Sequence, residues 1–171
     1  MRLYSTSVST PVGPFMLLAG DDGIYAAGFT TQPSELLSLL GPGSREAEVK
    51  ACADLSEHSR AVAAYFGGEI AAIDEIAVVQ QATPYLLAAW AALRDIPAGA
   101  PITYRDLAAR LGNAAAPRAA GSACGRNTVA VIVPCHRVLR TDGGLGGFGW
   151  GLPVKRWLLQ HEAGAAQSKG L

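Results

Sequence analysis

The chain has 171 residues, a formal net charge of zero and a hydrophobic content of 50%. This length accommodates one or two small domains that bury a core without disulfides or a structural metal. No apolar run approaches the roughly 20 residues that cross a bilayer, and the first residues lack the apolar stretch of a signal peptide. We therefore expect a cytoplasmic protein that does not bind membranes.

The formal charge is divided unequally along the chain. Residues 1–82 hold four basic and ten acidic side chains, whereas residues 83–171 hold ten basic and four acidic ones. A basic half is what binding to a phosphate backbone requires. Charges that drifted apart by chance on a solvated surface remain the alternative interpretation.

Cysteine usage argues against both a disulfide framework and a metal site. The chain has three cysteines, Cys52, Cys124 and Cys135, and their odd number and irregular spacing do not fit a set of paired disulfides. No Cys-x-x-Cys or Cys-His cluster offers four tetrahedral ligands, so the sequence predicts no metal and no cofactor.

The first 82 residues predict a small mixed α/β domain with antiparallel hairpins. Strands are expected near residues 3–8, at 15–19 and at 24–29, the last two joined by the turn Gly-Asp-Asp-Gly at 20–23. A helix is expected over 53–66 and a last strand over 73–79. No catalytic motif is present here, and the domain boundary is placed at 80–83.

Residues 83–171 predict a mainly helical second domain. Thr83 can cap a helix, and Thr103 with Asp106 forms a capping-box-like start of a short helix that ends near Leu111. A further helix is expected from Pro117. Two short helices joined by a turn are typical of a helix-turn-helix, here of a winged-helix-like kind, although two packed helices without a DNA role would show the same pattern.

A final helix is expected from Pro153 to Gly164, with Val154, Trp157, Leu158 and His161 on its buried face and residues 165–171 as a flexible tail. Together these elements predict the α+β fold class. The domains are residues 1–82 and 83–171.

The hexapeptide at 133–138, VPCHRV, is the strongest chemical signal. The apolar, β-branched run at 129–133 predicts a buried strand, and Pro134 ends it directly before Cys135. A cysteine beside a histidine at the end of a strand suits a reactive thiolate. Neighbouring residues of an extended chain point in opposite directions, so Cys135 and His136 would communicate through a turn or a bridging water.

Several motifs in the same order and spacing resemble the O6-alkylguanine-DNA alkyltransferases, also called methylated-DNA–protein-cysteine methyltransferases. The resemblance runs from about residue 96 to residue 162. It rests on ITYRDLA at 102–108, RAAG at 118–121, RN at 126–127, VPCHRV at 133–138 and KRWLLQHE at 155–162.

The resemblance implies single-turnover transfer of an alkyl group from O6 of guanine, with O4 of thymine as a further candidate, to the sulfur of Cys135. It implies that His136 takes the thiol proton through a water and that Glu162 steadies the imidazolium. Tyr104 would hydrogen-bond the departing guanine, and Asn127 would tie the turn that orients the cysteine. Val138, Phe148, Gly149 and Trp150 would line the substrate pocket.

The partner implied is double-stranded DNA containing O6-alkylguanine, bound by a monomer that associates with the nucleoid. A thiol inside a protein cannot reach O6 in a stacked duplex, so the nucleotide would be rotated out. Arg118 would occupy the space left in the stack, the small residues Ala119, Ala120 and Gly121 would permit close approach, and Arg126 would contact phosphate.

Three other functions would each account for part of the sequence. A lesion-binding protein without transfer activity would lack the acceptor cysteine, which is present. A cysteine hydrolase would need an oxyanion hole and leaves Arg118 and the charge division unexplained. A helix-turn-helix regulator leaves the Pro-Cys-His motif unexplained.

Overall fold

The computed structural model describes residues 1–169 of the chain. They form two compact units: Met1–Ala82 with Thr128–Ile132, and Thr83–Asn127 with the residues from Val133 onward. The segment Thr128–Ile132 thus groups with the first unit, although it lies between two stretches of the second. No helix among the described residues is long and apolar enough to cross a membrane.

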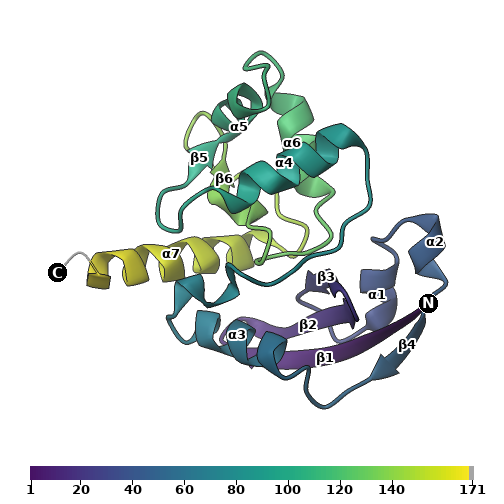
Figure 1. Cartoon of the computed structure of the whole chain (residues 1–171). Helices are drawn as coiled ribbons and strands as arrows, with labels where there is room; N and C mark the ends of the chain where they lie inside the picture. Colours follow the sequence, from purple (N-terminus) through teal and green to yellow (C-terminus); the bar gives the residue numbers. More distant parts are fainter. Residues whose placement is uncertain (170–171) are drawn as a thin grey trace. The chain divides into compact units, whose positions relative to one another are not determined.

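The first unit is built on a mixed four-stranded sheet of order β3-β2-β1-β4 (Figure 1). β1 (Arg2–Thr10), β2 (Gly13–Gly20) and β3 (Gly23–Gly28) are antiparallel neighbours, and β4 (Glu48–Ala51) runs parallel to β1. The predicted hairpin at 20–23 is confirmed. Residues 15–19 of β2 are all buried, and α3 (Glu57–Phe66) packs against β1 and adds Phe66 to an aromatic cluster with Phe15 and Phe29.

Two elements of this unit differ from the prediction. The helix expected from residue 53 begins at Glu57, because residues 53–56 form a turn in which Ser56 N–H donates to the Asp54 carboxylate. The strand expected over 73–79 is reduced to an isolated parallel bridge between Val78 and Ile24 of β3, and the rest of that prediction is wrong. Ile70, Ile73 and Ile76 are buried at intervals of three residues, the period of a 3-10 helix, and Ile70–Ile73 forms one (η1). The helices α1 (Pro33–Leu37) and α2 (Pro42–Arg45) complete the unit.

The second unit is mainly helical. It contains α4 (Pro84–Arg94), α5 (Tyr104–Arg110), α6 (Pro117–Gly125) and α7 (Leu152–Lys169), together with the parallel pair β5 (Ile102–Thr103) and β6 (Val138–Leu139). The mixed α/β class is confirmed by this arrangement. α5 and α6 pack against each other, as two helices of a helix-turn-helix would. The winged-helix-like form remains a prediction.

Local signals set the starts of these helices. The Thr83 hydroxyl accepts a hydrogen bond from Leu86 N–H, and Thr103 and Asp106 form the reciprocal capping box. Pro117 occupies the first turn of α6. All three predicted helix starts are confirmed, because each depends only on residues within one turn.

The buried strand predicted over 129–133 is wrong. Val129 makes only an isolated bridge to Ala27, after which the chain turns and Val131 adopts a φ of +71°. The whole segment is nevertheless buried. Its apolar run therefore reflects burial on all sides rather than pairing in a sheet, a distinction that periodicity cannot make.

The last helix differs from the prediction in its end and its buried face. It continues through Gly164 to Lys169, so residues 165–169 are not a tail, while residues 170–171 lie outside the described residues. Gly164 is exposed, and a single glycine lowers helix stability by only about 1 kcal/mol. Leu158 is buried as expected, but its companions on that face are Lys155 and Glu162. Val154, Trp157 and His161 are half-buried.

Candidate active site

Cys135 opens a single 3-10 turn, η2 (Cys135–Arg137), directly after Pro134. Its N–H donates to the carbonyl oxygen of Val133 at 2.9 Å, and the Asn127 amide donates to the same carbonyl at 2.8 Å. Asn127 thus holds the segment that leads into the cysteine. The turn leaves Cys135 9% exposed.

The surroundings of Cys135 act on its thiol in opposite directions. Burial raises the pKa of the Cys135 thiol, because a thiolate loses hydration there. A hydrogen bond from the Asn127 side chain and the positive charge of Lys155 oppose that rise in pKa. The resting thiol is therefore protonated, with two groups in place to stabilise a thiolate once the proton leaves.

The next two residues of the turn share one buried carboxylate. His136 Nε2 lies 2.9 Å from Glu162 Oε2. The Arg137 guanidinium donates to both oxygens of Glu162, also at 2.9 Å, and to the carbonyl oxygen of Ile96 at 2.7 Å. His136 and Glu162 are at most 1% exposed, and Arg137 is 5% exposed. The resemblance had paired Glu162 with His136 alone.

This cluster determines which nitrogen of His136 carries the proton. Burial raises the pKa of Glu162, but His136 and Arg137 together lower it well below its usual range, so the carboxylate is ionised. An ionised carboxylate only accepts hydrogen bonds, hence Nε2 of His136 must carry the hydrogen. The lone pair then lies on Nδ1, which is buried and has no hydrogen-bond partner among the described residues. Burial also lowers the pKa of His136, which keeps the ring neutral.

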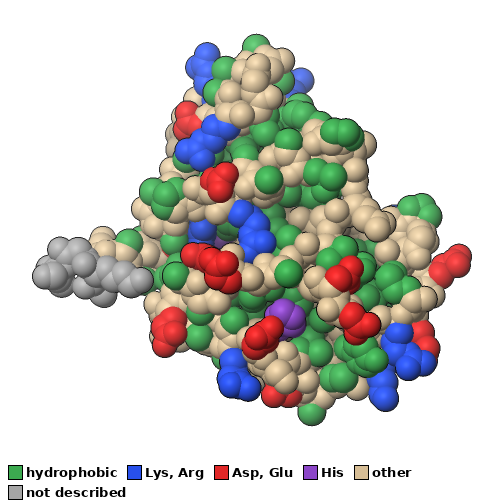
Figure 2. All heavy atoms as spheres, viewed as in Figure 1, with side chains coloured by type: hydrophobic (Ala, Val, Ile, Leu, Met, Phe, Trp, Pro, Cys, Tyr) green, Lys and Arg blue, Asp and Glu red, His purple; other side chains and the backbone are tan. Residues whose placement is uncertain are grey.

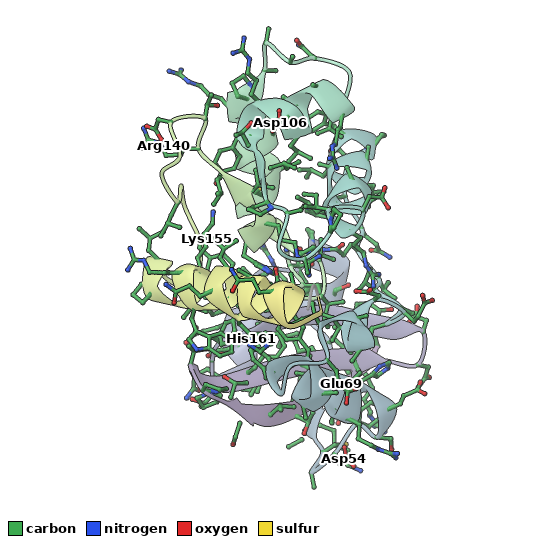
Figure 3. All side chains as sticks on the ribbon, turned by 90° about the vertical axis from the view of Figure 1, so that its left-hand side faces the viewer. Asp54, Glu69, Asp106, Arg140, Lys155 and His161 are labelled. Carbon is green, nitrogen blue, oxygen red and sulfur yellow. The ribbon has the colours of Figure 1, made fainter. Side chains whose placement is uncertain are left out.

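Lys155 is a site residue whose role was not predicted from the sequence. Its ammonium donates to the carbonyl oxygens of Val138 at 2.7 Å and Gly147 at 3.2 Å, and it lies 5.8 Å from the ring centroid of Tyr104. In Figure 3 the Lys155 side chain extends from α7 toward the other elements of the second unit. Burial lowers the pKa of this ammonium, and the neighbouring thiols Cys135 and Cys124 oppose that change.

The signals for Lys155 and Arg137 were in the sequence. Lys155, Leu158 and Glu162 recur at the spacing of one helix face, and Arg137 follows the Cys-His pair directly. Two opposite charges on an otherwise apolar helix face predict burial with partners, because an unpaired buried charge is strongly unfavourable.

Tyr104 begins α5 and contacts the glycine-rich loop at residues 143–151. Burial raises the pKa of its phenol, and the thiols of Cys124 and Cys135 raise this pKa further. Gly146 has a φ of +71°, and a Cβ atom there would lie 2.6 Å from the Tyr104 hydroxyl oxygen. Glycine at this position therefore makes room for the phenol.

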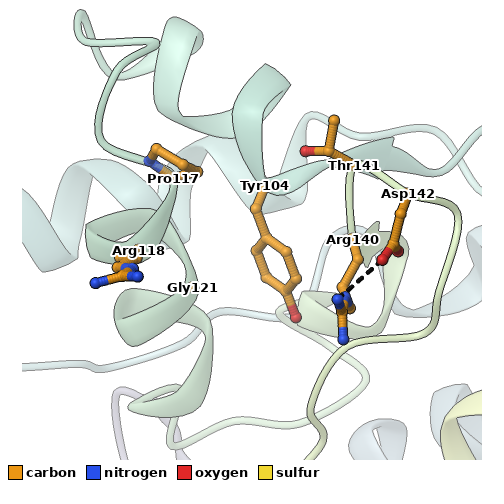
Figure 4. A pocket seen from close by; sticks show the side chains of 7 residues that line it. All are labelled: Tyr104, Pro117, Arg118, Gly121, Arg140, Thr141 and Asp142. Carbon is orange, nitrogen blue, oxygen red and sulfur yellow. Dashed lines mark hydrogen bonds and ion pairs between the residues drawn. The ribbon is translucent and has the colours of Figure 1, made fainter.

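A cavity of about 600 Å³ opens beside Tyr104 (Figure 4). This volume lies within the range of small-molecule sites. The lining combines the aromatic ring with two cations, one carboxylate and small residues: Tyr104, Pro117, Arg118, Gly121, Arg140, Thr141 and Asp142. Arg118, at the start of α6, is exposed and has no acidic partner among the described residues.

The other predicted DNA contacts lie on or near α6. Ala119 and Arg126 are exposed, whereas Ala120 is fully buried, so its side chain cannot reach DNA. Figure 2 shows lysine and arginine side chains around α5, at the top of the view. α5 carries Arg105 and Arg110.

The four predicted pocket residues do not line this cavity. Val138 is fully buried and supplies the carbonyl that binds Lys155. Phe148 and Trp150 are half-buried and Gly149 is exposed. Their role as a pocket remains a prediction.

The other cysteines differ from Cys135 in their surroundings. Burial first, and then the neighbouring Cys135, raise the pKa of Cys124 to about 12, so its thiol stays protonated. Cys52 is half-buried in the first unit. Among the described residues no cluster of histidine, cysteine and acidic side chains could hold a metal ion.

Comparison with known proteins identifies the relatives of this chain. Residues 84–164 match the family described as 6-O-methylguanine DNA methyltransferase, DNA binding domain. A methylated-DNA–protein-cysteine methyltransferase from Salmonella typhimurium is 34% identical over 168 residues, covering 95% of this chain and 96% of the relative. One of the same name from Methanosarcina acetivorans is 33% identical over 160 residues, covering 94% and 98%.

Solved structures agree with these relatives. The O6-methylguanine methyltransferase of Mycobacterium tuberculosis superposes with a TM-score of 0.77 at 28% identity, over 96% of this chain and 93% of the other. A structure of the enzyme from the same organism in complex with DNA gives a TM-score of 0.78 at 30% identity, over 95% and 94%. Because near-full-length relatives exceed 30% identity, the chain belongs to the methylated-DNA–protein-cysteine methyltransferase family.

Proposed function

We propose that this chain repairs DNA by moving an alkyl group, chiefly methyl, from O6 of guanine to the sulfur of its own Cys135. The observation that carries the proposal is the buried thiol next to a neutral histidine whose Nε2 is bound to an ionised carboxylate and whose Nδ1 lone pair is unused. The relatives, whose names describe this transfer, and the solved complex with DNA support it.

The reaction is a displacement at the alkyl carbon. Sγ of Cys135 attacks that carbon, the S–C bond forms and the C–O6 bond breaks. The thiol proton passes through a water molecule to Nδ1 of His136, and Glu162 stabilises the imidazolium that results. Lys155 and the Asn127 amide stabilise the thiolate in the meantime.

The departing guanine needs a proton to leave as the neutral base. Tyr104 supplies this proton, since its raised pKa keeps the phenol protonated, and the proton taken up by His136 restores the phenol through solvent. The thioether formed on Cys135 is too stable for the side chains of the site to remove its alkyl group and regenerate the thiol. Each molecule therefore acts once.

The target nucleotide must leave the base stack before the thiol can reach it. Arg118, exposed at the start of α6, is suited to fill the space left behind, with Ala119 and Gly121 allowing close approach and Arg126 contacting phosphate. We propose double-stranded DNA containing O6-alkylguanine as the partner of a monomer, with O4-alkylthymine as a second substrate. Affinity should fall as salt rises, because cations condensed on DNA are released.

Intact-protein mass spectrometry after incubation with a duplex carrying one O6-methylguanine tests this function. The expected result is a gain of one methyl group per molecule, located on the Cys135 peptide, and none for Cys135→Ser. Cys124→Ser and Cys52→Ser are matched controls that should still be methylated. Multiple turnovers per molecule, or transfer that survives Cys135→Ser, would overturn the proposal. Binding of DNA without transfer would favour a lesion-binding protein instead.

A further inference from the structure

The cavity beside Tyr104 contains a second arginine, Arg140, to which the mechanism proposed above assigns no role. Arg140 directly follows β6, and it lines the cavity together with Arg118 from α6. In Figure 4 the ring of Tyr104 projects between these two arginines. The two cations thus come from different elements and share one cavity.

Arg140 is held by its own turn. Its guanidinium donates to Asp142 Oδ2 at 2.8 Å, and Asp142 Oδ1 accepts from Gly144 N–H at 2.9 Å. The backbone of Arg140 bonds to Gly143 and Gly144 at 2.9 Å. A Cβ on residue 144 would lie 3.1 Å from the Asp142 carboxylate and 3.4 Å from Cδ of Arg140, so glycine there leaves room for the pair.

The ion pair between Arg140 and Asp142 is exposed to solvent. Their side chains are 62% and 60% exposed, and an exposed pair of this kind contributes little to stability. Replacing the carboxylate by a phosphate group as the partner of Arg140 therefore costs little free energy. The planar guanidinium suits a phosphate, which it can bind through two parallel hydrogen bonds.

We propose that Arg140 binds a backbone phosphate of the extruded nucleotide, and that Asp142 holds the Arg140 guanidinium in an ion pair until DNA binds. Arg140 is then a positioning residue: it fixes the nucleotide in the cavity while Arg118 acts in the base stack. Asp142 lowers the affinity for DNA by competing for the same guanidinium. This inference rests on the proposed function, since it takes DNA as the occupant of the cavity.

Binding measurements on the full chain test the inference. Cys135→Ser serves as the background, so that no transfer occurs, and a duplex with one O6-methylguanine is the probe. Arg140→Gln should weaken binding about threefold to tenfold. As salt rises from roughly 50 to 200 mM, the affinity of Arg140→Gln for DNA should fall by a factor about threefold smaller than the fall in the background, since one phosphate contact is missing. Arg140→Lys should restore part of the affinity.

Asp142→Asn should tighten binding about two- to fivefold, and this gain should vanish in the double variant Arg140→Gln/Asp142→Asn. Arg60→Gln, an exposed arginine of α3 in the first unit, is the matched control for the loss of one positive charge. Unchanged affinity and salt dependence for Arg140→Gln, or weaker binding for Asp142→Asn, would overturn the inference.

A second readout uses the reactive chain. The free base O6-benzylguanine has no phosphate, so Arg140→Gln should slow the reaction with DNA at least several-fold more than the reaction with the free base. Equal slowing of both reactions would show that Arg140 acts without a phosphate and would overturn the inference. Failure of the unmodified protein to methylate Cys135 would refute the proposed function instead, and the binding measurements would still decide the role of Arg140.

Discussion

Replacing Glu162 with glutamine tests the buried cluster that prepares His136. The carboxylate accepts three hydrogen bonds of 2.9 Å, one involving His136 and two from Arg137. Glutamine keeps one acceptor oxygen, adds a donor and carries no charge. Arg137, 5% exposed, would then keep a buried positive charge without a counter-charge, its remaining acceptors being the glutamine oxygen and the carbonyl oxygen of Ile96.

The expected loss in the free energy of unfolding follows from removing one partner of a buried ion pair. Such a change lowers the free energy of unfolding by about 3–5 kcal/mol, and the retained acceptor offsets about 1 kcal/mol. We expect a net loss of about 3 kcal/mol. For a chain of this length, that corresponds to a fall in Tm of about 6–12 °C. Single-turnover transfer should slow about tenfold to hundredfold, because the imidazolium of His136 loses its counter-charge.

The loss of stability in Glu162→Gln should depend on pH in a defined direction. The pKa of Glu162 is lowered in the folded state, so the stability that it contributes is present above the unfolded carboxyl pKa of about 4.3. That contribution is lost as the pH falls toward the folded value. Denaturant unfolding should therefore show a larger difference between Glu162→Gln and the unmodified protein at pH 7 than at pH 3.

The double variant Arg137→Met/Glu162→Gln separates stability from chemistry. Removing the stranded guanidinium should recover about 1 kcal/mol or more relative to Glu162→Gln, while transfer stays slow because the carboxylate is still absent. An unfolding free energy of Glu162→Gln within about 0.5 kcal/mol of the unmodified protein at pH 7 would refute this reasoning. A double variant less stable than Glu162→Gln would also refute it.

Three further predictions concern the loop, the base and the pocket. Gly146→Ala should destabilise the protein by about 1–3 kcal/mol and slow transfer, because the new Cβ meets the Tyr104 hydroxyl at positive φ. Gly147→Ala, which has open space at its Cβ, should change both far less, and equal losses would contradict the steric argument. Because burial lowers the pKa of His136, the transfer rate should stay level as pH falls to about 6.5 and decline only below it. A decline centred above that pH in rate measurements would contradict a neutral buried base. Trp150→Gly should raise the rate with O6-benzylguanine more than with O6-methylguanine if the indole narrows the pocket, and equal rates for both substrates in the unmodified protein would exclude that role.

Signals that act within a few residues were readable from the sequence. The caps at Thr83 and Thr103, the first-turn Pro117 and the hairpin at 20–23 depend on neighbouring backbone groups, and the structure confirms each. The Cys-His pair and its flanking motifs were also sufficient to indicate the family, because side-chain identity at fixed spacing is a property of the sequence.

The tertiary structure decided what depends on contacts between distant segments. The run at 129–133 has the composition of a strand but turns at Val131, and only its burial could be anticipated. The sharing of Glu162 between His136 and Arg137, and the placing of Lys155 over Tyr104, arise where α7 packs on η2 and the glycine-rich loop. The cavity shared by Arg118 and Arg140 likewise joins segments that no local pattern relates. Hydrogen-bond geometry within one turn is encoded locally, whereas the partner of a buried charge is set by whichever segment the folded chain brings beside it.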